Sequence, residues 1–77
     1  MSYVDNMTEL EYLNDIPWVE LQDIDGIGSQ VAGKIVNNRS FWGEFKGFYE
    51  LRKITGISTK TVQKLNKHIA RQIEEGI

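Results

Sequence analysis

Apolar residues recur at intervals of three and four positions along most of the chain, which is the spacing of one face of an α-helix. The longest stripe comprises Val62, Leu65, Ile69 and Ile73. An earlier one comprises Val31, Ala32, Ile35 and Val36. No stretch alternates between apolar and polar residues for long, as a half-buried strand would. The pattern therefore predicts an all-α fold.

Capping residues and glycines divide this pattern into five helices. Thr8 and Glu11 have the spacing of a capping box, so a short helix is expected to begin at Thr8. Pro17 suits the first position of a second helix, and Ser29 is an acceptable N-cap for a third. We expect the next three helices over residues 17–24, 29–39 and 48–53, with a loop over 40–47. The last helix is expected to begin at Ser58 or Thr59 and to fray near Gly76.

The chain has 77 residues, enough for one small domain with a single core. The absence of cysteine excludes disulfides and thiolate chemistry, and one histidine, His68, leaves no metal cluster or catalytic triad. We therefore expect no enzyme, no cofactor and no small-molecule substrate. No apolar run is long enough to cross a membrane, and the N-terminus has no secretory pattern, so the expected location is cytoplasmic.

Charge is distributed unevenly along the chain although the net charge is only −2. Residues 1–33 hold seven acidic residues and no lysine or arginine, whereas residues 34–71 hold all nine basic residues against two acidic ones. Such an asymmetry indicates either one face that meets an anion or a surface that is merely segregated. Charge alone does not decide between them.

The chain contains an internal repeat with a period of thirty residues. The segment 21–28, LQDIDGIG, matches the segment 51–58, LRKITGIS, and the register continues because Ala32 pairs with Val62 and Ile35 with Leu65. Each copy predicts a short helix, a glycine-containing hairpin and a longer helix. The matching positions are mostly apolar, so the repeat by itself fits a duplicated packing unit as well as a duplicated functional element.

A glycine-bearing turn that opens a helix has a chemical meaning. It directs unpaired backbone N–H groups outwards at the positive end of the helix dipole, where a phosphate oxygen is a natural occupant. A side chain at this position would hold a phosphodiester backbone away from the amides. Two such hairpins side by side would contact both strands of a duplex and read little of the base sequence.

Both copies resemble the helix-hairpin-helix motif, apolar-x-x-apolar-x-Gly-apolar-Gly followed by a helix. The span from Leu13 to Ile69 is similar to the tandem domain of the ComEA-like competence DNA receptors. The matching features are Leu13-Asn14, Glu20-Leu21, Gly26-Ile27-Gly28, Ala32, Arg39, Gly43, Phe45, Leu51 and Gly56-Ile57. The resemblance implies an N-terminal extension over 1–13 and a compact tandem domain over 14–77. The first motif would occupy about 17–39 and the second about 48–75.

The family resemblance also implies sequence-independent binding of double-stranded DNA through hairpin amides and nearby basic side chains. One strand would meet Gly26, Ile27, Gly28, Ser29 and Lys34. The other strand would meet Gly56, Ile57, Ser58, Lys60 and Lys64. In the first hairpin Asp25 stands where the family usually has proline, and in the second Ser58 replaces the final glycine.

The alternative is a protein–protein interaction or regulatory module that keeps this scaffold with weak or lost DNA binding. The isoelectric point near 5.3, the acidic first half and the pair Phe41 and Trp42 motivate it. The aromatic pair either covers the core or forms an exposed patch for a protein partner. We expect Phe45, Trp18, Phe48 and Tyr49 in the core, His68 at the surface or its edge, and Asp23 with Asp25 in an acidic turn.

Overall fold

The computed structural model describes residues 8–75, so most of the expected N-terminal extension lies outside the described residues. The helices are α1 (Glu9–Asp15), α2 (Trp18–Gln22), α3 (Gly28–Trp42), the 3₁₀ helix η2 (Phe48–Lys53) and α4 (Thr59–Glu75). No strand occurs between residues 8 and 75, which confirms the all-α prediction. Within the same range, no helix is long and apolar enough to cross a membrane.

The first two helices begin next to Thr8 and Pro17, the residues at which the sequence predicts helix starts. The Thr8 backbone N–H donates to Glu11 Oε1 over 2.9 Å and the Glu11 N–H donates to Thr8 Oγ1 over 3.1 Å, which confirms the capping box. Pro17 is the N-cap of α2 rather than its first residue, and α2 ends at Gln22, two residues before the expected Ile24. The start of α1 is therefore stabilised by its own capping box, whereas α2 has only five residues and no side-chain cap.

Helix α3 differs from its expected bounds at both ends. It begins at Gly28, with Ile27 rather than Ser29 in the N-cap position. It continues to Trp42, so residues 40–42 are helical and the loop expected over 40–47 is wrong in its first part. The helix ends where Gly43 adopts a φ of +94°, a conformation that side chains disfavour, and the Gly43 N–H donates to Arg39 O over 3.0 Å. Glycine at 43 is the stop signal, because nothing before it breaks the helix.

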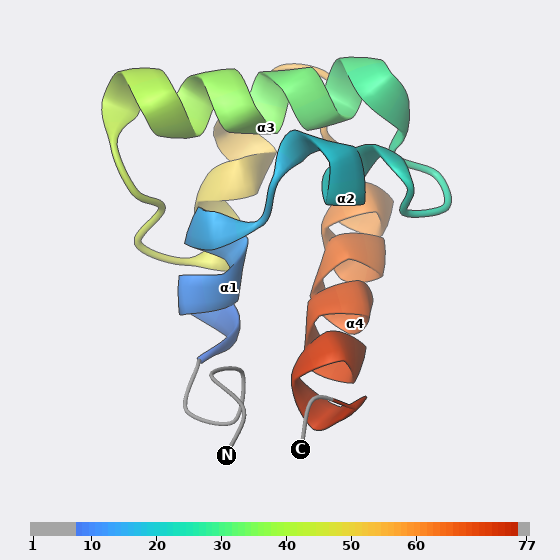
Figure 1. Ribbon diagram of the computed structural model, residues 1–77. Helices are drawn as coiled ribbons and strands as arrows, with labels where there is room; N and C mark the ends of the chain where they lie inside the picture. Colours follow the sequence, from blue (N-terminus) through green and yellow to red (C-terminus); the bar gives the residue numbers. More distant parts are fainter. Residues whose placement is uncertain (1–7, 76–77) are drawn as a thin grey trace.

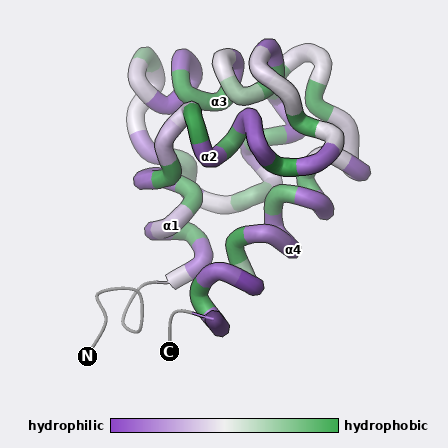
Figure 2. The backbone as a smooth tube through the Cα atoms, turned by 45° about the vertical axis from the view of Figure 1, so that its right-hand side comes forward, coloured by the Kyte–Doolittle hydropathy of each residue, from purple (hydrophilic) through white to green (hydrophobic). Residues whose placement is uncertain are grey.

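Helix α3 lies across one end of the molecule, and α4 runs away from it beside α1 (Figure 1). The buried core between them contains twelve residues: Leu13, Ile16, Leu21, Ile24, Ile27, Ala32, Ile35, Phe45, Leu51, Ile57, Leu65 and Ile69. The repeat supplies much of this core, since Leu21 and Leu51, Ile27 and Ile57, and Ile35 and Leu65 are all buried. Figure 2 shows hydrophilic and hydrophobic segments alternating along the turns of α4, whose apolar stripe enters this core.

Asn14 connects α1 to the loop that follows α3. Its Nδ2 donates to Leu10 O over 3.1 Å and to Phe45 O over 3.0 Å, and its Oδ1 accepts from the Phe45 N–H over 2.6 Å. Arg39 Nη1 donates to Leu13 O over 3.0 Å and ties α3 to the same helix. Burial lowers the pKa of the Arg39 guanidinium, and the charge of Asp15 opposes this shift. These bonds hold Phe45 in the core, where it is 4% exposed as expected.

Two aromatic residues expected in the core lie at the surface instead. Trp18 is 40% exposed and Tyr49 is 64% exposed, whereas Phe48 packs against the core. Helices α2 and η2 are short and bury one position each, and Leu21 and Leu51 occupy those positions. Trp18 and Tyr49 therefore remain outside, because a domain of this size has little interior volume to fill.

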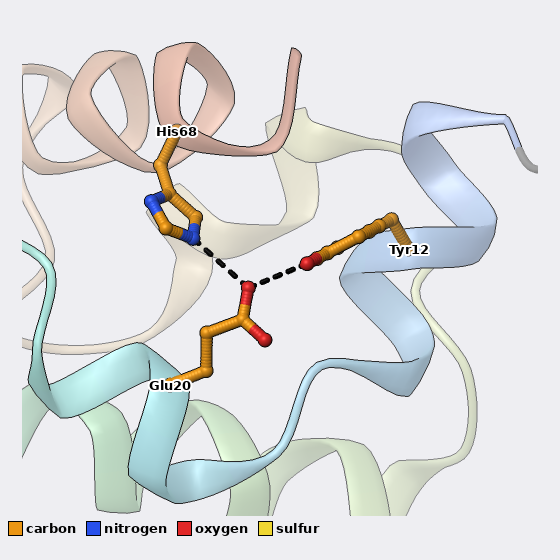
Figure 3. Close-up of polar contacts among 3 residues, drawn as sticks. All are labelled: Tyr12, Glu20 and His68. Carbon is orange, nitrogen blue, oxygen red and sulfur yellow. Dashed lines mark hydrogen bonds and ion pairs between the residues drawn. The ribbon is translucent and has the colours of Figure 1, made fainter. Parts of the chain in front are cut away.

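A polar cluster joins α1, α2 and α4 (Figure 3). One oxygen of Glu20, Oε2, accepts a hydrogen bond from the Tyr12 hydroxyl over 2.5 Å and lies 2.9 Å from His68 Nε2. The expectation of an edge position for His68 is confirmed, because its side chain is partly exposed, at 23%. Desolvation, with a smaller contribution from Glu20, raises the pKa of Tyr12 to about 12. The cluster fastens three elements together at the surface of the core.

Candidate nucleic-acid interface

The first hairpin, residues 25–28, connects α2 to α3 through two glycines in the left-handed region. Gly26 has a φ of +88° and Gly28 a φ of +70°. Between them the Ile27 N–H donates to Ile24 O over 3.0 Å, and the Ile27 side chain is buried. A Cβ added to Gly28 would have no neighbour within 4 Å, so this glycine faces open space. The backbone can therefore be approached closely from outside at Gly28.

The N-terminus of α3 leaves backbone donors free. No side chain caps it, and the N–H groups of Gly28, Ser29 and Gln30 have no acceptor among residues 8–75. Ser29 and Gln30 are exposed. Free N–H groups at the positive end of a fifteen-residue helix form a favourable place for an anionic oxygen.

The second hairpin, residues 55–58, has one residue in the left-handed region instead of two, and one of its backbone donors is already used. Gly56 has a φ of +93°, and the Ile57 N–H donates to Ile54 O over 3.2 Å. Ser58 Oγ accepts from the Thr61 N–H over 3.2 Å and so caps α4. No residue other than glycine has a positive φ in the described chain, so Ser58 replaces glycine without backbone strain. One amide of this helix start is therefore satisfied internally.

Ile27 and Ile57, which the resemblance implied as DNA contacts, have a structural role in the hairpins. Their amides are bonded within the hairpins, and their side chains are 5% and 7% exposed. Neither offers a free donor or an accessible surface to a nucleic acid. Both side chains anchor their hairpins in the core.

Each hairpin receives a lysine from the other copy of the repeat. Lys34 of α3 does not lie at the first hairpin, as its place in the sequence suggested; its Nζ donates to Thr55 O in the second hairpin over 3.0 Å. An added Cβ on Gly56 would come within 2.6 Å of Lys34 Nζ, and one on Gly26 within 2.6 Å of Lys64 Nζ. Lys34 and Lys64 are thirty residues apart, so the exchange follows the repeat. The first hairpin thereby gains a positive charge that its own segment lacks.

Helix α4 carries a continuous basic stripe that the sequence-based site contained only in part. The α4 basic stripe consists of Lys60, Lys64, Lys67 and Arg71, spaced four, three and four residues apart. At 3.6 residues per turn these positions form one face, on the opposite side of the helix from Leu65 and Ile69. The helical spacing of the basic residues would have been enough to identify Lys67 and Arg71 as members of the stripe, because the apolar residues of α4 show which face of the helix points outward.

Two acidic residues stand close to this stripe. Asp23 and Asp25 border a hollow together with Lys64, Lys67 and Arg71, on the side of α4 that faces the first hairpin. None of these charges comes within ion-pair distance of another; in the described chain that distance is reached only between His68 and Glu20. The basic side chains thus keep their charge available, and the two carboxylates weaken the local positive potential.

Phe41 and Trp42 form an exposed aromatic pair at the end of α3. Their side chains are 78% and 76% exposed, and the ring centroids lie 4.9 Å apart in an edge-on arrangement. The interpretation that they cover the core is therefore wrong, and the exposed patch is what the structure shows. The pair borders a hollow whose remaining lining residues are Lys34, Asn37, Asn38, Ser40 and Ile54.

Comparison with protein families agrees with this geometry. The family model described as the helix-hairpin-helix motif matches residues 12–70, well over half of the chain. The chain belongs to the helix-hairpin-helix family. It is an all-α helix-hairpin-helix domain, and membership of this family points to nucleic-acid binding in general. No curated protein and no solved structure matches the chain in the other two comparisons.

Proposed function

We propose that this helix-hairpin-helix protein is a non-enzymatic module that binds double-stranded DNA through its phosphate backbone, without sequence preference, in the tandem manner of the ComEA-like receptors. The observation that carries the proposal is the exchange of Lys34 and Lys64 between the two hairpins. It gives each hairpin a glycine turn, a helix start and a cation at one place. Those are the components that hold a phosphate.

The two hairpins would hold the two strands in slightly different ways. At the first, Gly28 allows close approach, the N–H groups of Gly28 and Ser29 donate, and Lys64, whose side chain covers Gly26, supplies charge. At the second, the Ser58 hydroxyl and the start of α4 donate, and Lys34, which lies against Gly56, supplies charge together with Lys60. All these groups would contact phosphate oxygens, so no base is read directly.

The α4 basic stripe would extend the contact along the duplex, from Lys60 at the second hairpin past Lys64 at the first. From Lys60 to Arg71 the helix rises roughly 16 Å at 1.5 Å per residue. Phosphates of one strand advance about 3.4 Å per base pair along the duplex axis, so the stripe spans about five base pairs. A handful of neutralised phosphates gives a log–log salt slope of about −3 to −5 and a dissociation constant of roughly 10⁻⁴ to 10⁻⁶ M.

Fluorescence anisotropy with a labelled random-sequence duplex at low and moderate salt tests the proposal. We expect binding that weakens with salt. The affinity should fall further when Lys60→Glu and Lys64→Glu are combined, because two cations that attract phosphates are replaced by carboxylates that repel them. Lys46→Glu is the matched control, since Lys46 borders a hollow with Thr8 and Glu11 rather than a hairpin. Absence of binding at low salt, or equal losses in the control and the double variant, would contradict the proposal.

The second candidate is a protein-interaction module on the same scaffold. The exposure of Phe41 and Trp42 favours it, together with the carboxylates of Asp23 and Asp25 beside the first hairpin. Aromatic side chains are frequent anchors of protein interfaces. A protein that fails to bind the duplex at low salt, and loses a protein partner when Trp42→Ala is introduced, would fit this candidate instead.

A further inference from the structure

The two copies of the repeat present different side chains on equivalent faces. Moving back thirty residues from the α4 basic stripe leads to Gln30, Lys34, Asn37 and Phe41 on α3. Only the second position is basic in both copies. Lys34 of the first copy lies at the second hairpin, and Lys64 of the second copy lies at the first hairpin. The face of α3 that carries Lys34 is therefore the equivalent of the face of α4 that carries Lys64. Phe41 therefore stands on α3 where α4 has Arg71.

A hollow continues from the second hairpin to this aromatic position. Lys34, whose Nζ bonds to Thr55 O of that hairpin, forms one end of the lining, and Phe41 with Trp42 forms the other. Asn37 and Asn38 lie between them. Among residues 8–75, no acidic residue borders the hollow, and the one charged residue in its lining is a lysine. The lining thus combines a cation, amide groups that can donate and accept hydrogen bonds, and two exposed rings.

These groups match the parts of an unpaired nucleotide. A phosphate suits Lys34, the hydrogen-bonding edge of a base suits the asparagine amides, and the face of a base stacks on an aromatic ring. Inside a duplex the faces of the bases are covered by the neighbouring base pairs, whereas a strand that has left the duplex offers the faces of all its bases. A phosphate track on α4 and an aromatic platform on α3 would therefore suit a DNA that is double-stranded at one end and single-stranded at the other.

We propose that Phe41 and Trp42 stack on unpaired bases of a strand that leaves the duplex at the second hairpin, so the preferred ligand is duplex DNA with a single-stranded extension. This inference rests on the proposed duplex binding. A protein partner at the same pair is the competing occupant. Continuity with the second hairpin favours the polyanion, as does the absence of acidic residues from the part of the lining that the structure describes.

The test compares three labelled ligands by anisotropy: a blunt duplex, the same duplex with an oligothymidine extension, and the same duplex with an abasic extension of equal length. The abasic ligand keeps the added phosphates and removes the bases. We expect the oligothymidine ligand to bind on the order of tenfold more tightly than the abasic one. In the double variant Phe41→Ala with Trp42→Ala this ratio falls towards one. Tyr49→Ala removes another exposed aromatic residue and keeps the ratio.

Each outcome is decisive. Equal affinity of the wild-type protein for the oligothymidine and abasic ligands overturns the inference and leaves duplex binding intact, and the aromatic pair then fits a protein partner. A ratio that persists in the double variant also overturns it. Failure to bind any of the three ligands refutes the proposed duplex binding together with this inference. Circular dichroism confirms that each variant is folded, which we expect because both aromatic side chains are largely exposed.

Discussion

Replacement of Lys64 by glutamine tests whether this lysine serves the first hairpin, to which the structure assigns it, or the second, to which its place in the sequence assigns it. Its side chain covers Gly26, while its own helix starts at the second hairpin. Lys64→Gln removes the charge and keeps a polar side chain. If Lys64 neutralises a phosphate held at the first hairpin, the variant should bind duplex DNA more weakly and with a shallower salt dependence.

The size of the effect follows from simple electrostatics. Two unit charges 4 Å apart in water interact by about 1 kcal/mol, which corresponds to a change in affinity of roughly fivefold. One phosphate fewer makes the log–log salt slope about 0.9 less steep. Added salt should therefore narrow the difference between the variant and the wild-type protein. A purely structural effect of the substitution would not depend on salt in this way.

A double-mutant cycle identifies the hairpin that Lys64 serves. Gly28→Ala perturbs only the first hairpin: the added Cβ enters open space, where the proposed phosphate would lie, and φ of +70° costs about 1–2 kcal/mol for a residue with a side chain. The cycle of Lys64→Gln with Gly28→Ala should show coupling of more than about 0.5 kcal/mol in binding. The parallel cycle of Lys34→Gln with Gly28→Ala should be additive within about 0.3–0.5 kcal/mol.

Sequence neighbourhood makes the opposite prediction, because Gly28 and Lys34 belong to the same copy of the repeat. Coupling of Gly28 with Lys34 and additivity with Lys64 would therefore refute the exchanged arrangement. Thermal denaturation of all variants is the control, since each must be folded at the temperature of the titration. Lys34 carries one additional function, the bond to Thr55 O, so its variant should also be slightly less stable.

Three further predictions concern stability and ionisation. Asn14→Ala leaves the backbone N–H and C=O of Phe45 without partners and should lower the free energy of unfolding by about 2 kcal/mol in urea denaturation; an unchanged midpoint would contradict this. Phe45→Ala should lower it by about 3–5 kcal/mol, whereas Trp42→Ala should change it by less than about 0.5 kcal/mol, because only the former is buried. The pKa of Tyr12 is raised to about 12, so its contribution to stability is complete below the ordinary tyrosine value of 10.0 and is lost as pH rises through 12. The wild-type protein should therefore lose more stability over this interval than Tyr12→Phe, and parallel curves would show that the pKa of Tyr12 is not raised.

The local features of the fold could be predicted from the sequence because each depends on neighbouring residues. The capping box at Thr8 and Glu11 satisfies backbone donors within one turn, so it needs no tertiary contact. The helical spacing of apolar residues identified the buried face of α4 for the same reason. The predicted end of α3 was wrong because no residue near it gives a strong signal for a helix end. Residues 40–42 contain no strong helix breaker, so the helix continues to Gly43.

Burial of the aromatic residues could not be predicted, since it depends on which side chains fill a small core first. Leu21 and Leu51 take the buried positions of the two short helices, so Trp18 and Tyr49 remain outside. The sequence leaves Phe41 and Trp42 open to either interpretation, because a pair of aromatic residues at a helix end can fold inwards or outwards. Packing decides in favour of the surface.

By itself, the sequence determined the helical class, the thirty-residue repeat and the two glycine turns, because periodicity, capping and backbone freedom act over a few residues. Only the tertiary structure decided which charge meets which turn. The two copies pack against each other so that Lys34 reaches the second hairpin and Lys64 the first, a relation between residues that the chain keeps twenty or more positions apart. The electrostatics of each hairpin is therefore a property of the packed pair of repeats.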